Sequence, residues 1–197
     1  MDSNTEPNHC DSCGTAVPCY DGIYLSGEHS RRFLCSKCYN ETMAEAAGLD
    51  FDHLSFHPIT LADTEGMNHT FHFQTRLFGD NVLIRAMEIR GDGPRGYEFS
   101  IVGDADEDLF ALFTKLIERL RRELSRKHIE PSDFTRYGIT NDDIVRGRIT
   151  WDDDTGGEVP LLVIDGKELS WDEFGRMLMT YEGFHFKIEI FEGSEER

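Results

Sequence analysis

The stretch that decides the N-terminal fold is Cys10-Asp11-Ser12-Cys13-Gly14, and a second pair, Cys35-Ser36-Lys37-Cys38, follows after 21 intervening residues. A C-x-x-C turn lets two thiolates reach one ion while backbone N–H groups point at the sulfur atoms, and Gly14 permits the positive φ that such a turn often needs. Four thiolates form a closed tetrahedral shell, which leaves no position for water or substrate. The spacing therefore predicts one structural zinc site, with Zn²⁺ bound by Cys10, Cys13, Cys35 and Cys38.

Two alternatives to zinc remain open on sequence grounds: four reduced cysteines without metal, and an iron–sulfur centre. Cys19, the fifth cysteine, is expected to be a spare thiol, and His9 and His29 are candidate substitute ligands. In a cytosolic chain, paired cysteines point to metal and away from disulfides.

The residues between and after the two pairs predict a hairpin and a helix. Strands are expected at 23–25 and 32–34 with a turn over 26–30, and a helix over 39–47 is expected to end at Gly48. This order of knuckle, hairpin and helix resembles the treble-clef class of zinc fingers over about 40 residues. The resemblance implies a fold and no function, because treble clefs serve many unrelated roles.

Composition sets the broad class of the protein. The chain has 197 residues, 39% of them hydrophobic and 29% charged, with a formal net charge of −18. It has no apolar run of the roughly 20 residues that span a bilayer, and its polar, acidic N-terminus does not resemble a signal peptide. We therefore expect a globular cytoplasmic protein without a membrane partner, and the negative charge disfavours nucleic acid.

Residues 49–130 predict an antiparallel sheet covered by one long helix. Alternating side chains indicate strands over 69–77, 82–89 and 97–102, and 59–61 is a candidate fourth strand. Asp104 or Asp106 is the expected helix cap. The predicted core stripe of the helix consists of Leu109, Phe113, Leu116, Leu120 and Leu124, widened by Phe110 and Ile117.

The second half of this helix is basic. One interpretation of these cations is a basic patch that binds nucleic acid or an acidic protein partner. The other, which is favoured, is that they suit the negative end of the helix dipole and pair with Glu118 and Glu123. The cations are Lys115, Arg119, Arg121, Arg122, Arg126 and Lys127.

Residues 131–197 predict a second group of elements after a break at 131–133. The expected elements are a short helix at 141–145, strands at 148–151 and 161–164, a tight turn at Asp165-Gly166, a helix from the capping box Ser170-Trp171-Asp172-Glu173 to Gly183, and a strand at 184–190. Trp171, Phe174, Leu178 and Tyr181 are expected on one side of the helix, and Phe184, Phe186, Ile188 and Ile190 are expected to point inward from the strand. Residues 131–197 are expected to pack with residues 49–130 as one α+β body.

Other chemistry-bearing residues give weak signals. Asp152-Asp153-Asp154 lacks the alternate spacing of a calcium loop, so a solvated loop is favoured over a Mg²⁺ or Ca²⁺ site. A second metal site from His53, His57, His69 and His72 is not favoured, because His69 and His72 would face opposite sides of a strand. No phosphate-binding loop, nucleophile elbow, zinc-protease or deaminase motif is present.

The sequence thus predicts an α+β chain with a treble-clef-like zinc finger over 1–48, followed by antiparallel strands and packed helices over 49–130 and 131–197. This layout is similar to that of uncharacterised bacterial proteins, a resemblance that implies no activity. The expected function is that of a non-enzymatic protein-interaction or adaptor protein with structural zinc. A nucleic-acid-associated finger protein is the alternative, and an enzyme without a sequence motif is a third.

Overall fold

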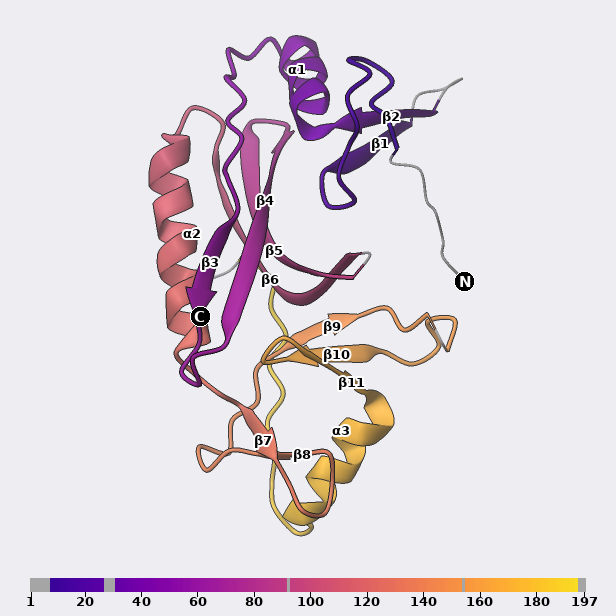
Figure 1. The fold of residues 1–197 in the computed structure, drawn as a ribbon, viewed down its shortest axis with the longest axis vertical. Helices are drawn as coiled ribbons and strands as arrows, with labels where there is room; N and C mark the ends of the chain where they lie inside the picture. Colours follow the sequence, from indigo (N-terminus) through magenta and orange to yellow (C-terminus); the bar gives the residue numbers. More distant parts are fainter. Residues whose placement is uncertain (1–7, 27–30, 92, 154, 195–197) are drawn as a thin grey trace.

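The computed structural model describes residues 8–26, 31–91, 93–153 and 155–194. Within these ranges the chain is α+β, as predicted, with helices and several antiparallel sheets. Figure 1 shows the N-terminal hairpin and helix at one end of the long axis, a sheet with a long helix in the middle, and small strands with a third helix at the other end.

The N-terminal part forms the predicted hairpin and helix. β1 (Gly22–Ser26) pairs antiparallel with β2 (Arg31–Cys35), and α1 (Ser36–Ala47) begins where β2 ends. Gly48 ends α1 in the left-handed conformation with φ of 67°, which glycine adopts without a steric penalty. Most of the predicted turn, residues 27–30, lies outside the described residues.

The central sheet has the strand order β3-β4-β5-β6, which confirms the predicted meander and its fourth strand. The strands are β3 (Ile59–Ala62), β4 (Asn68–Phe78), β5 (Asn81–Arg90) and β6 (Gly93–Asp104), and α2 (Leu109–Leu124) covers one face. The buried residues between α2 and the sheet include Phe71, Phe73, Val82, Ile84, Ala86, Leu112, Leu116 and Leu120.

α2 differs from the prediction at its start and in its stripe. Its cap is Asp108, whose side chain accepts a hydrogen bond from the N–H of Phe110, because β6 still occupies Asp104. Leu112 is buried in place of Phe113, which is partly exposed and stacks on Phe56 with ring centroids 4.0 Å apart. Of the helices that the structure describes, none has the length and apolar character needed to cross a membrane.

The C-terminal elements form two small sheets and a helix. β7 (Ile129–Pro131) pairs with β8 (Tyr137–Ile139); β9 (Arg148–Thr150), β10 (Leu161–Ile164) and β11 (Lys167–Ser170) form the second sheet, followed by α3 (Trp171–Leu178) and a 3₁₀ turn (Met179–Tyr181). The turn at Asp165-Gly166 and the Ser170–Glu173 capping box are confirmed.

Three predictions for this part are wrong. Residues 141–145 contain a turn at 141–142 and no helix, since Asp143 has a left-handed φ of 53° that a helix cannot continue through. The helix predicted to run to Gly183 ends at Leu178, and a 3₁₀ turn over Met179–Tyr181 follows, so Tyr181 does not lie on α3; the buried residue of α3 is Met177.

The third wrong prediction is the strand at 184–190, which lies in no helix or strand. Its four apolar side chains, expected to point inward, are strongly exposed: Phe184 71%, Phe186 85%, Ile188 69% and Ile190 77%. Alternation makes a segment able to form a strand, but a strand also requires a free sheet edge. At the β6 edge, Arg119 donates a hydrogen bond to the backbone carbonyl of Ser100 at 3.0 Å and so occupies part of that edge.

Candidate metal centre

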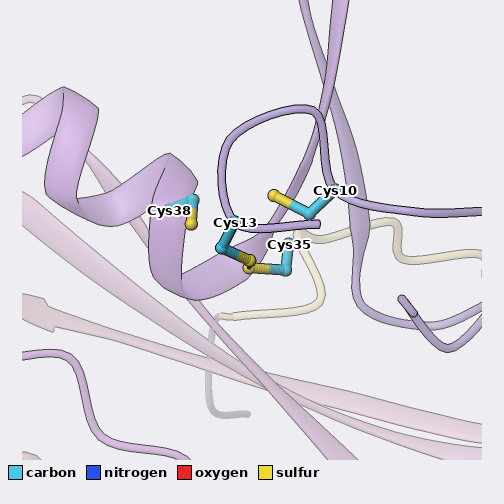
Figure 2. Close-up of side chains that lie close together, drawn as sticks. All are labelled: Cys10, Cys13, Cys35 and Cys38. Carbon is cyan, nitrogen blue, oxygen red and sulfur yellow. Dashed lines mark hydrogen bonds between the residues drawn. The ribbon is translucent and has the colours of Figure 1, made fainter. Parts of the chain in front are cut away.

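The four predicted cysteines come together from three pieces of backbone (Figure 2). Cys10 and Cys13 lie in the loop before β1, Cys35 is the last residue of β2, and Cys38 lies in the first turn of α1. Their Sγ atoms all lie within 4.8 Å of one another, and those of Cys13 and Cys35 are 3.9 Å apart.

This arrangement fits a tetrahedral thiolate site. Zinc–sulfur bonds of about 2.3 Å in a tetrahedron place two sulfur atoms about 3.8 Å apart. The 3.9 Å between the Cys13 and Cys35 sulfur atoms is close to that separation. Four sulfur donors suit a soft or borderline metal such as zinc and do not suit Mg²⁺ or Ca²⁺.

Backbone hydrogen bonds shape the first cysteine turn. The N–H of Gly14 donates to the carbonyl of Cys10 at 2.9 Å, and Gly14 has φ of 73°, as the sequence predicted. Asp11 fixes this turn to β2: its N–H donates to the carbonyl of Phe33 at 2.8 Å, and its carboxylate accepts from the N–H of Phe33 at 2.6 Å. The first pair is therefore held against the strand that carries Cys35.

The second pair depends on the junction between β2 and α1. Cys35 is the N-cap residue of α1 and makes no side-chain capping bond, so its sulfur is left for the cluster. Asp21 supplies the cap instead, since its carboxylate accepts hydrogen bonds from the N–H and the hydroxyl of Ser36. Burial raises the pKa of the Cys35 thiol overall, and the backbone N–H of Cys38, in the first turn of α1, opposes that rise.

The thiols differ in how readily they lose a proton. Hydrogen bonds with the hydroxyl and the backbone N–H of Thr15 lower the pKa of Cys13 to about 6. Burial alone would raise the pKa of Cys10, but backbone N–H groups that point at its sulfur lower it overall. Burial, with the neighbouring thiols, raises the pKa of Cys38 to about 12. A metal ion must displace the Cys38 proton, so metal binding weakens as the pH falls.

The other candidate ligands stand apart from this cluster. Cys19 is exposed and, like the exposed His9, is not among the grouped residues, while His29 lies outside the described residues. His69 is buried. The ring of His72, three residues further along β4, packs against the ring of Tyr20, with ring centroids 4.7 Å apart. In the described part of the chain, the four cysteines are the one group of three or more His, Cys, Asp or Glu side chains whose ligand atoms lie close enough to share a metal ion.

The sequence did not reveal a buried ionic network beside α2. The ring of His69 lies 2.9 Å from the Glu88 carboxylate and 3.4 Å from that of Asp63. Lys127 pairs with Asp63 at 2.5 Å, and Arg90 makes two 2.9 Å hydrogen bonds to Glu88. The signal was a histidine and a glutamate at inward positions of two neighbouring strands, but their pairing depends on a register that no local pattern gives.

Three family models match consecutive parts of the chain. Residues 9–50 are similar to a domain of unknown function (DUF7685), residues 52–125 to a second (DUF7686) and residues 128–195 to a third (DUF7713). Each model covers less than half of the chain, and none carries a described activity. No curated protein and no solved structure matches the chain.

Proposed function

We propose that this chain is a zinc-binding protein of the cytoplasm whose treble-clef-like finger is structural and whose α+β body acts in protein–protein interaction, without catalysis. The metal half of the proposal is supported by the four sulfur atoms within 4.8 Å of one another. They fill all positions of a tetrahedral ion, so the ion stabilises the finger and activates no water.

The observation that carries the interaction half is the exposed segment 184–190. Phe184, Phe186, Ile188 and Ile190 alternate with polar residues and are 69–85% exposed. On the polar side, Lys187 pairs with Glu189 at 2.5 Å. Soluble monomers rarely expose a continuous apolar row of this kind without a binding role.

The chemistry of the segment defines its partner. A segment whose apolar side chains alternate with polar ones suits addition to the open edge of a partner protein's sheet, where backbone hydrogen bonds give affinity and alternate side chains give specificity. The partner is therefore expected to offer a free strand edge flanked by apolar pockets.

The test begins with a partner that co-purifies with the intact protein from its native cells and is then produced in pure form. The double variant Phe186→Ser/Ile188→Ser is expected to weaken binding at least about tenfold, because two apolar anchors are lost. The matched variant His185→Ser/Lys187→Ser alters the other face and is expected to bind within about twofold. Equal binding by the two variants would show that the segment is not the docking element.

Nucleic-acid association is the alternative, and the surroundings of α2 weaken it. Lys115 pairs with Glu107 at 2.9 Å, and Lys127 pairs with both Asp63 and Glu65. A chain of net charge −18 gains little from phosphate contacts. Binding to DNA or RNA that weakens steeply with salt would favour the alternative over protein interaction.

A further inference from the structure

A cavity of about 500 Å³ is lined by residues of β5, β6, α2, β9, β10 and the C-terminal segment. Its walls hold five of the 15 arginines of a chain whose net charge is −18. They are Arg85, Arg119, Arg122, Arg146 and Arg148.

Contacts within the cavity hold several guanidinium groups in place. Arg85 and Arg148, from β5 and β9, each lie 3.2 Å from the carboxylate of Glu98 on β6. Arg119 donates to the carbonyl of Ser100 at 3.0 Å. These contacts join the sheet, α2 and β9 around one space, so Arg85, Arg119 and Arg148 are ordered before any ligand arrives, which lowers the entropic cost of binding.

Two buried polar atoms in the cavity lining have no hydrogen-bond partner. One is the hydroxyl oxygen of Tyr97, a residue only 8% exposed, and the other is Nε of Arg148. Burial and the nearby carboxylates of Asp165, Asp63 and Glu88 raise the pKa of Tyr97, so its hydroxyl stays protonated and can donate. Since buried donors are nearly always satisfied in folded proteins, two in one cavity point to a missing acceptor.

We propose that this cavity binds a small organic anion through a phosphate or carboxylate group that accepts hydrogen bonds from Arg148 and Tyr97. Guanidinium groups match the oxygen geometry of both anions. The volume falls within the range of small-molecule sites, about 300–1,000 Å³. Apolar lining residues, among them Phe99, Ile149 and Phe191, suit an organic body beside the anionic group.

The charge balance limits the ligand. Four carboxylates, those of Glu98, Glu123, Asp165 and Glu189, line the cavity beside the five arginines. Carboxylates among the arginines suit a ligand with one or two negative charges and disfavour a polyanion such as nucleic acid. The site shares no residue with the cysteine cluster, and neither Phe186 nor Ile188 lines it.

The test is calorimetric titration of the full chain with inorganic phosphate, adenosine monophosphate and citrate at constant ionic strength. Saturable binding of at least one probe is expected; the phosphate and citrate arms separate the two anion types, and the nucleotide reports the contribution of an organic body. Tyr97→Phe removes only the unpaired hydroxyl, so the variant is expected to fold at least as stably as the parent protein.

Tyr97→Phe and Arg148→Lys are each expected to weaken binding about tenfold or more, because each removes a buried donor to a charged acceptor. The matched controls are Tyr137→Phe and Arg121→Lys, which make the same changes outside the cavity and are expected to bind within about twofold. The proposal is overturned if none of the three probes binds saturably, or if the cavity variants bind as the controls do.

Discussion

The side chain of Asn40, on α1, accepts a hydrogen bond from the backbone N–H of Leu77, on β4, at 2.8 Å. Its amide nitrogen donates to the carbonyl of Thr75, also at 2.8 Å, and Asn40 is fully buried. β3 pairs only with residues 68–71 of β4, so further along the strand Asn40 satisfies backbone groups that β3 does not reach. One side chain of the finger helix thus takes the place of a neighbouring strand.

Asn40→Ala is expected to destabilise the protein strongly. The change leaves a buried N–H and a buried carbonyl without partners, and each such loss costs about 1–3 kcal/mol. We expect the free energy of unfolding, measured by urea denaturation, to fall by about 3 kcal/mol. Asn68→Ala, at the exposed start of β4, is the control and is expected to change it by less than about 0.5 kcal/mol. Equal effects would contradict the docking role of Asn40.

Metal removal is expected to unfold the finger before the sheet. The finger core, which includes Val17, Ile23, Leu34 and Tyr39, shares no buried residue with the core between α2 and the central sheet. Chelation should therefore raise amide hydrogen exchange in α1 and β2 while α2 and β5 stay protected. Loss of protection throughout the chain would show instead that the Asn40 contacts couple the two parts into one folding unit.

The cysteine cluster is expected to bind one metal ion per chain. Cys38→Ser removes a buried thiol of the cluster and is expected to lower bound zinc, measured by elemental analysis, well below one ion per chain. Cys19→Ser alters an exposed thiol outside the cluster and should keep full occupancy. Iron and sulfide in the purified protein, with visible absorbance, would instead favour the iron–sulfur alternative.

Local signals account for what the sequence predicted correctly. Gly48 ends α1 because it adopts a positive φ, and Ser170 forms a capping box with Glu173, three residues later. The C-x-x-C spacing of the cysteine pairs likewise predicted which four sulfur atoms lie together. The strand at 184–190 was wrong because pairing needs an edge elsewhere in the fold. Tyr97 and Arg148, 51 positions apart in the sequence, lie in one cavity only after three elements have packed, so no pattern in the sequence pointed to them.

Asp63 gives the protein a stability that acid should remove. Burial alone would raise the pKa of Asp63, but hydrogen bonds from Lys127 and from the backbone N–H groups of Met67 and Glu65 lower it well below its usual range. A carboxyl group whose pKa is lower in the folded than in the unfolded state stabilises the fold above the unfolded pKa of about 3.9, and this stability is lost as the pH falls toward the folded value.

Asp63→Asn removes this charge and leaves Lys127 near Glu65 alone. At neutral pH the variant is expected to be about 3 kcal/mol less stable, the typical cost of breaking a buried ion pair. Because the parent protein loses its advantage as Asp63 takes up a proton, the two unfolding free energies should converge below about pH 4. Asp133→Asn, at an exposed position, controls for the loss of one charge. A difference that stayed constant from neutral pH to about pH 2 would mean that the charge of Asp63 contributes nothing and that the variant acts through packing alone.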